Sequence, residues 1–296
     1  MKRWFYFAFF IFTMEKIVFT SEYFNVTDTL NCGQLFRYFP VPKKENAYYV
    51  NSADKRCLIY EDGENTVIEC EDADRAYFRD YFDLARDYGA IVAAGAAQGG
   101  ALKTAAELGR GIRILNQNKA EALFSFIVSQ NNNIPRIKGI IERLCAGAGQ
   151  KRVFCGEEYY TFPTAAEMSA KPLEFFKEIG LGYRADYIKR LADDFSKTFN
   201  EQEFSHLTTK DLKKRLTAIY GVGPKVADCV SLFGFHRADS FPVDTWIEKV
   251  YRENFGGTLT DRAKISDEFT AKFGQNAGYF QQYLFYYKRT LEKVGD

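Results

Sequence analysis

The chain has 296 residues, 46% of them hydrophobic, and its 40 basic and 39 acidic side chains leave a net charge of +1. This length allows two domains, or three small ones, each with its own core. The balanced charge excludes broad electrostatic binding of nucleic acid, so DNA contacts would need locally placed basic residues and backbone amides. Six dispersed cysteines without a Cys-x-x-Cys pair, and only two histidines, disfavour a zinc ribbon, a dense disulfide scaffold and a histidine-rich metal site.

The first thirteen residues join a basic start, Met1-Lys2-Arg3, to an apolar run. The segment resembles a short signal peptide, but it is too short to span a bilayer and no Ala-x-Ala cleavage site follows it. We treat residues 1–13 as a doubtful N-terminal extension, with an export signal as the alternative. We expect no membrane contact and a cytoplasmic location.

Between Lys16 and Cys70, short runs of β-branched and aromatic residues predict an antiparallel sheet, and Asp62-Gly63 marks a turn. The runs are 17–20, 35–41, 47–51, 57–60 and 66–70. A helix is predicted at about 73–88, with further helical candidates up to 115. The glycine- and alanine-rich interval 90–100 is interpreted as a connection.

Beyond Asn118 the pattern is almost entirely helical. A helix over 119–130 ends in Asn131-Asn132-Asn133, which favour caps and turns. Another helix begins near 134, a further one covers 173–179, and Gly180-Leu181-Gly182 breaks the pattern. The sequence contains no repeats and no low-complexity tract.

The run from Leu216 to Asp228 predicts a helical hairpin, which we place at about 207–233. Gly221 and Gly223 permit a tight reversal, because glycine tolerates positive φ angles. Pro224 suits the first turn of a new helix, where backbone N–H groups lack intrahelical partners and can bind phosphate. Apolar residues at spacings of three and four support two helices packed on one face.

The hairpin and the later run Pro242-Val243-Asp244-Thr245-Trp246 together resemble the helix-hairpin-helix plus Gly-Pro-Asp motif of base-excision DNA glycosylases. The 8-oxoguanine DNA glycosylase family is the most similar. Segments 31–37, 122–137 and 181–185 match this family in the same order. The resemblance implies an α+β fold, with a TBP-like antiparallel sheet domain over 14–112 and a two-lobed all-α body over 113–296.

Lys225 and Asp244 carry the chemistry in this interpretation. A neutral lysine amine, favoured by desolvation and the positive end of a helix, can attack the anomeric carbon of a nucleotide. It displaces the base and holds the sugar as a Schiff base, which serves strand cleavage by β-elimination. We expect Asp244 at a helix N-cap, ionised and stabilising positive charge on the sugar. The alternative interpretation, for each residue considered alone, is that Lys225 is an ordinary surface lysine and that Asp244 only begins a helix.

The resemblance also implies which residues hold the base. The carbonyl of Gly33 reads the N7 hydrogen by which 8-oxoguanine differs from guanine. Gln281 binds the Watson–Crick edge, and Phe285 stacks on one face of the base with Cys229 opposite. Without the resemblance, the aromatic cluster around Phe285 is typical of a core.

A second group is implied for the DNA around the extruded base. Tyr183 is the wedge that fills the gap, while Asn131, Arg136 and Arg184 contact the orphaned partner base. Two arginines and an amide satisfy the acceptor edge of cytosine, which gives an opposite-cytosine preference as a hypothesis. Arg136 matters because some bacterial relatives lack arginine there.

Amides of Gly221 and Gly223 are expected to hold a DNA phosphate, with a bridging monovalent or calcium ion as an option. Trp246 stands where animal proteins have a phosphate-binding histidine, so that contact is open. No four-cysteine loop follows Cys229, and we therefore expect no iron–sulfur cluster, no metal site and no required cofactor.

These observations predict a bifunctional 8-oxoguanine DNA glycosylase with apurinic lyase activity. Its partner is double-stranded DNA containing oxidised guanine, and we expect a monomer, associated with the nucleoid if bacterial. One alternative is an alkylpurine glycosylase of the same superfamily, which usually has no lysine at the hairpin. The other is a non-catalytic helix-hairpin-helix module that binds DNA.

Overall fold

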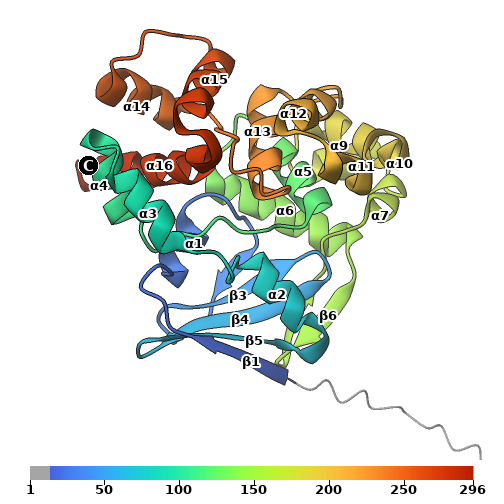
Figure 1. The fold of residues 1–296 in the computed structure, drawn as a ribbon. Helices are drawn as coiled ribbons and strands as arrows, with labels where there is room; N and C mark the ends of the chain where they lie inside the picture. Colours follow the sequence, from blue (N-terminus) through green and yellow to red (C-terminus); the bar gives the residue numbers. More distant parts are fainter. Residues whose placement is uncertain (1–13, 296) are drawn as a thin grey trace, which may run out of the picture.

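A five-stranded antiparallel sheet lies below a larger helical body in the computed structural model, which describes residues 14–295 (Figure 1). The predictions about residues 1–13 lie outside the described residues. Along the sheet the strand order is β1-β5-β4-β3-β2. The strands are β1 (Met14–Phe19), β2 (Tyr38–Pro40), β3 (Ala47–Ser52), β4 (Lys55–Asp62) and β5 (Asn65–Glu71). The predicted α+β class and antiparallel sheet are confirmed.

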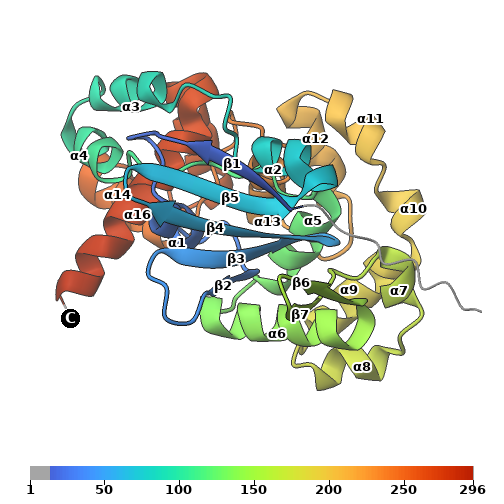
Figure 2. The same ribbon diagram turned by 90° about the horizontal axis from the view of Figure 1, so that it is seen from below.

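One face of the sheet forms a small core of its own. Ile17, Ile68 and Ile59 lie opposite one another on β1, β5 and β4, and all three are buried. They pack with aromatic side chains of helix α2 (Arg75–Tyr81) and its C-terminal end, including Phe78. Figure 2 shows the strands side by side, with α2 across one end of the sheet.

The prediction for residues 73–100 was partly wrong. A single 3-10 turn, η1 (Asp72–Asp74), precedes α2, which stops before Asp83, a residue with φ +49°. The expected connection at 90–100 is instead helical, with α3 (Tyr88–Ala96) followed by α4 (Gly100–Leu108). Gly95 allows a close helix approach here, because a Cβ on it would lie 2.9 Å from Ala106 Cβ.

The helices form two lobes above the sheet (Figure 1). One lobe contains α5 (Lys119–Val128), α6 (Ile134–Ala148), α7 (Ala165–Ser169), α8 (Leu173–Glu178), α9 (Arg184–Asp193), α10 (Phe195–Thr198), α11 (Glu201–His206), α12 (Thr209–Thr217) and α13 (Pro224–Phe233). The other contains α3, α4, α14 (Thr245–Phe255), α15 (Arg262–Phe273), η2 (Gly274–Asn276) and α16 (Ala277–Gly295), with α1 (Val26–Asn31) between it and the sheet. The boundary at 112/113 stays a prediction, although α3 and α4, which precede it, pack beside α16.

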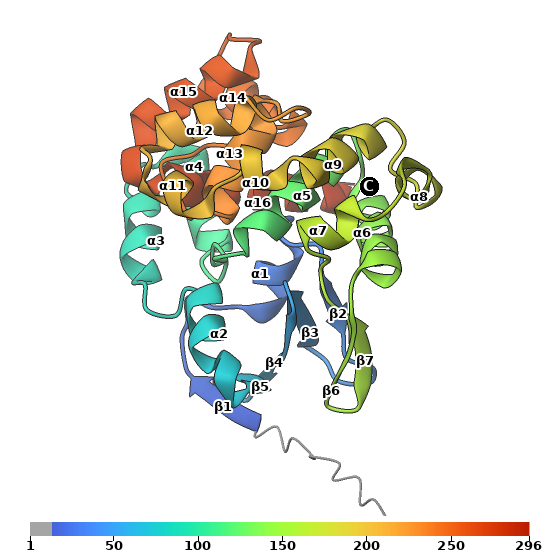
Figure 3. The same ribbon diagram turned by 90° about the vertical axis from the view of Figure 1, so that its right-hand side faces the viewer.

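A short β-hairpin was missed by the expectation of an almost entirely helical C-terminal part. Strands β6 (Lys151–Phe154) and β7 (Glu157–Tyr160) pair antiparallel and extend beside the main sheet (Figure 3). Its turn residues Cys155 and Gly156 both have positive φ, as in a two-residue loop of type I′. Phe154 packs edge-on against Tyr49, with ring centroids 6.4 Å apart.

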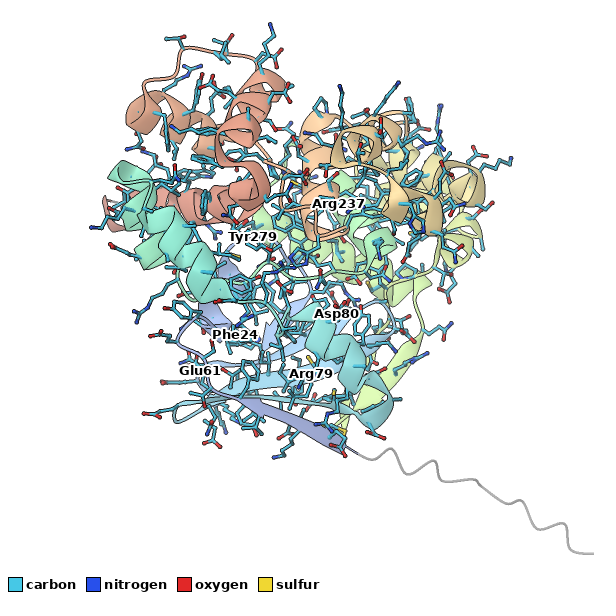
Figure 4. All side chains as sticks on the ribbon, viewed as in Figure 1. Phe24, Glu61, Arg79, Asp80, Arg237 and Tyr279 are labelled. Carbon is cyan, nitrogen blue, oxygen red and sulfur yellow. The ribbon has the colours of Figure 1, made fainter. Side chains whose placement is uncertain are left out.

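The two lobes are joined near Arg237 and Tyr279, which are labelled in Figure 4. Arg237 follows α13 and donates from Nη2 to the carbonyl oxygens of Ser205 (2.6 Å) and Leu207 (3.1 Å). The amide of Gly278, beside Tyr279 in α16, donates to Ala238 O over 2.7 Å. These bonds fix the loop that leads from α13 to α14. Among the helices of residues 14–295, none has the length and apolar character needed to cross a membrane.

Candidate active site

The predicted helix-hairpin-helix is formed by α12 and α13. Gly221 has φ +85°, and its carbonyl accepts a 2.8 Å hydrogen bond from Gln130 Nε2. Gly223 has φ −88°, so only Gly221 uses the left-handed conformation that both glycines were expected to permit. No atom lies within 4 Å of a Cβ built on Gly223, which leaves its backbone open to approach from outside. Pro224 occupies the first turn of α13, as predicted.

Lys225 follows in the first turn of α13 and faces two connected spaces. It lines an outer cleft of about 760 Å³ and a small inner pocket, and Asp244 lines both. Lys225 Nζ lies 5.8 Å from the ring centroid of Phe126, whose ring stacks on Phe233. The structure therefore brings the predicted amine and carboxylate to one cleft, with aromatic rings beneath the amine.

Asp244 is the N-cap of α14, as the sequence predicted. Its Oδ1 accepts hydrogen bonds from the amides of Trp246 (3.0 Å) and Ile247 (2.9 Å). Burial raises the pKa of Asp244, while the Ile247 amide and the charge of Lys225 act in the opposite direction. The carboxylate is thus held in one orientation at the positive end of a helix.

The inner pocket joins the four residues predicted to hold the base, Gly33, Cys229, Gln281 and Phe285. Gln281 is 5% exposed and its Oε1 has no hydrogen-bond partner, a costly state for a buried amide unless a ligand pairs with it. Burial raises the pKa of the Cys229 thiol to about 11. The pocket is small, about 60 Å³, and it shares Lys225, Asp244 and Phe285 with the outer cleft.

Gly33 has φ +89°, and a Cβ there would lie 3.2 Å from Phe285 Cε1. Two side chains of α16 hold the turn that contains it. Gln282 Nε2 donates to Cys32 O over 2.6 Å, and Arg289 Nη1 donates to Asn31 O over 3.1 Å. These bonds fix the backbone of Gly33 against the pocket.

Three residues at this site were not predicted as functional: Phe126, Gln282 and Arg289. Phe126 looked like an ordinary core position of its helix. Gln282 and Arg289 act on residues about 250 positions earlier in the chain, so no local pattern marks them. For Gln282 the sequence offered one signal, since it directly follows Gln281, a residue already predicted to bind the base.

The predicted wedge and partner-base residues lie at the rim. Tyr183 precedes α9, is 54% exposed and lines the outer cleft with Asn131, which has φ +45°. Arg136 is exposed, and its Nη2 donates to Gly180 O over 3.3 Å. Arg184 is buried, and its guanidinium donates to the carbonyls of Gln130 and Asn131. In this structure Arg184 supports the loop that presents Asn131, and its contact with a base stays a prediction.

Trp246, at the place of the expected histidine, lines the outer cleft with Arg262. Lys249 Nζ lies 5.0 Å from the centroid of the Trp246 ring, within the range of a cation–π contact at the edge of the outer cleft. All six cysteines are free thiols. Within residues 14–295, no group of three or more His, Cys, Asp or Glu side chains is placed to hold a metal ion.

Two family models together match most of the chain. The 8-oxoguanine DNA glycosylase N-terminal domain matches residues 16–123, and the HhH-GPD superfamily base excision DNA repair protein matches residues 124–274. An N-glycosylase/DNA lyase of Saccharomyces cerevisiae is 36% identical over 159 residues, which cover 49% of this chain and 42% of that protein. The chain spans less than two thirds of the length of the curated relatives it matches.

Solved structures match over nearly the whole chain. MBOgg1, in complex with a low affinity DNA ligand, has a TM-score of 0.88 and 36% identity, covering 95% of this chain and 99% of that one. The 8-oxoguanine glycosylase/lyase of Clostridium acetobutylicum, in complex with double-stranded DNA containing cytosine opposite 8-oxoG, has a TM-score of 0.88 and 34% identity. That match covers 95% of this chain and 98% of the other.

Proposed function

The chain belongs to the HhH-GPD superfamily of base excision DNA repair proteins, and on this premise we propose that it is a bifunctional 8-oxoguanine DNA glycosylase and apurinic lyase. The observation that carries the proposal is one cleft lined by Lys225 and Asp244, with a recognition pocket at its inner end. Base removal needs a nucleophile, which is the amine of Lys225, and a fixed anion, which is Asp244. It also needs a pocket that binds the base, where Gln281 offers an unpaired amide oxygen.

Base removal requires the damaged nucleotide to leave the duplex stack, at a cost of a few kcal/mol. Tyr183 fills the vacated space, while the hairpin amides at Gly221 and Gly223 hold a phosphate of the strand. The exposed ring of Tyr183 and the open backbone at Gly223 support this assignment. A monovalent or calcium ion bridging the hairpin and the phosphate would be held by backbone carbonyl oxygens of the hairpin, since the N–H groups are donors.

The neutral amine of Lys225 then attacks C1′ of the nucleotide, and the bond between C1′ and the base breaks. The carboxylate of Asp244 stabilises the positive charge that develops on the sugar. The departing base takes up the proton that the attacking nitrogen loses, and the sugar ring then opens at the C1′–O4′ bond to give the Schiff base. The Schiff base makes a proton at C2′ acidic, and loss of that proton expels the 3′ phosphate by β-elimination. Excision and strand cutting therefore share one covalent intermediate on Lys225.

Recognition of the oxidised base rests on the inner pocket. The N7 hydrogen of 8-oxoguanine needs an acceptor, which the carbonyl of Gly33 supplies from a backbone held by α16. Gln281 pairs with the Watson–Crick edge, and the base stacks between Phe285 and Cys229. The unpartnered Oε1 of Gln281 supports this assignment, because base binding would satisfy it.

We propose that the enzyme acts as a monomer on double-stranded DNA in the cytoplasm, at the nucleoid in a bacterium, without a required cofactor. A labelled duplex carrying one 8-oxoguanine tests the function. The expected result is a strand cut without alkali, and no cut when the lesion is replaced by guanine or by an alkylated purine. Release of the alkylated purine alone would contradict the proposal.

Arg136 gives a test of the choice of partner base. Opposite cytosine, excision by the native protein is expected to exceed excision opposite adenine, and Arg136→Met should reduce that ratio by about tenfold, the cost of one lost contact to a base edge. The measurement is single-turnover excision from duplexes with 8-oxoguanine opposite each of the four bases. Arg143→Met is the matched control. Arg143 lies on α6 like Arg136, and it donates to Ile179 O, next to the Gly180 carbonyl that Arg136 contacts. Equal cutting opposite adenine and cytosine by the native protein would refute the role of Arg136.

A further inference from the structure

A strip of three tyrosines lies outside the inner pocket and runs from the wedge, at the rim of the outer cleft, to the helical hairpin. Among the large hydrophobic side chains that residues 14–295 leave exposed, two are aromatic, Tyr183 and Tyr220, and each is 54% exposed. Tyr187 lies between them, with ring centroids 5.7 Å from Tyr183 and 5.2 Å from Tyr220, both pairs edge to face. We call Tyr183, Tyr187 and Tyr220 the tyrosine strip.

The strip is held rigidly by the hairpin itself. A Cβ built on Gly221 would lie 2.5 Å from Tyr187 Cγ, so the ring of Tyr187 rests directly on that glycine. Tyr220 is the residue immediately before Gly221. Tyr187 is therefore a positioning residue that fixes the wedge on one side and the phosphate-binding hairpin on the other.

The strip ends in a cation with unused donors. The guanidinium of Arg190 lies 4.5 Å from the centroid of Tyr220, in the range of a cation–π contact. Its Nε pairs with Asp186, at 2.9 Å from Oδ2. A guanidinium has five N–H donors, and this pairing of Nε leaves the two terminal nitrogens for an anion near Tyr220.

We propose that Tyr220 and Arg190 are DNA contacts, and that they bind the backbone of the strand held by the hairpin, beside the hairpin-bound phosphate. The proposal rests on the function proposed above, and it extends the protein–DNA interface to residues outside the reaction pocket. An exposed tyrosine carries a flat face for a sugar or base, and a stacked guanidinium suits a phosphate oxygen.

The position of the strip favours DNA over a protein partner. Tyrosine and arginine are also common in protein interfaces, but here both ends of the strip are DNA-binding elements of the proposed interface. A duplex that places a phosphate on the amides of Gly221 and Gly223 passes close to Tyr220, because Tyr220 directly precedes Gly221 and its ring is joined to Tyr183 through Tyr187. Contact with a protein would compete with that duplex.

The test uses the full chain and a duplex with a tetrahydrofuran abasic analogue, which requires neither lesion recognition nor excision. Tyr220→Ala is expected to weaken binding about tenfold, and Tyr220→Phe should stay within about twofold of the native protein because the ring face remains. Arg190→Gln should lower the slope of log Kd against log salt by about one, the value for one lost phosphate contact. Fluorescence anisotropy over a salt series gives both quantities.

Arg215→Gln is the matched control. Arg215 also covers an aromatic ring, that of Phe204, and pairs with a carboxylate, Glu203. Arg215 lies in the last turn of α12, but its guanidinium reaches Phe204, which packs on Phe235 after the C-terminal end of α13 and therefore away from Tyr220. The control should bind the duplex like the native protein.

Unchanged affinity and salt slope in folded Tyr220→Ala and Arg190→Gln would overturn the inference and leave the strip as a surface for a protein or a purely structural support. Equal losses in Arg215→Gln would also overturn it, since the effect would then not be local. If the native protein fails to excise 8-oxoguanine but Tyr220→Ala still weakens duplex binding, the proposed function falls and the contact stands.

Discussion

Lys225→Gln is expected to abolish removal of 8-oxoguanine, with a single-turnover rate at least about a thousandfold below that of the native protein. Glutamine is one bond shorter than lysine and keeps a polar end, but it has no nucleophilic amine, so neither attack at C1′ nor formation of the Schiff base is possible. Duplex affinity should stay within a few-fold, because the hairpin amides that bind phosphate are backbone groups. The measurement is excision of a labelled 8-oxoguanine duplex under single-turnover conditions.

Lys103→Gln provides the control for loss of a positive charge, because Lys103 is an exposed lysine of α4 on the outer side of its lobe. It should excise at the native rate. Base release by Lys225→Gln at the native rate would show that another group removes the base. It would favour the alkylpurine type of glycosylase, which usually works without a lysine here.

Asp244→Asn is expected to lower the excision rate by about 100- to 1,000-fold, with duplex affinity nearly unchanged. The amide cannot stabilise a developing cation as a carboxylate does. Asparagine is as good an N-cap as aspartate, and its Oδ1 can accept the amides of Trp246 and Ile247, so α14 should keep its position. Rate and affinity are measured separately on the same duplex. A non-catalytic binding module predicts duplex binding without excision, in the native protein and in the variant alike.

The pH dependence of this variant gives a second readout. Because burial raises the pKa of Asp244 above the ordinary 3.8, its carboxylate gains a proton at a higher pH than an exposed aspartate. As the pH is lowered, excision by the native protein should therefore begin to fall at a higher pH than the titration of an exposed aspartate would give. The pH profiles of the native protein and of Asp244→Asn should therefore differ on the acid side, because the variant lacks this titrating carboxylate.

The parts of the site that the sequence predicts best are those in which a residue type has a fixed local meaning. Gly221 and Pro224 define the hairpin because each restricts or frees the backbone in one particular way. Asp244 was predicted as an N-cap for the same reason, and the structure shows both amide hydrogen bonds. Gly33 and Gln281 lie far apart in the sequence, and only the family resemblance joined them.

The parts that could not be predicted depend on contacts between distant segments. Gly95 sits inside a helix because α4 and α16 approach it closely, and no local pattern distinguishes that from a loop glycine. The turn of the β6–β7 hairpin uses Cys155 before glycine, where Asn or Asp is the usual signal. The hydrogen bonds of Arg184 to the carbonyls of Gln130 and Asn131 join two separate segments, and no local pattern marks them.

Trapping with borohydride tests the covalent role of Lys225 most directly, because reduction turns the Schiff base into a stable bond between protein and DNA. Native protein and Lys103→Gln, mixed with an 8-oxoguanine duplex and reductant, should give a covalent complex that migrates as protein plus one DNA strand, and Lys225→Gln should give none. A trapped complex with Lys225→Gln, or free base without any trapped complex in the native protein, would contradict the account.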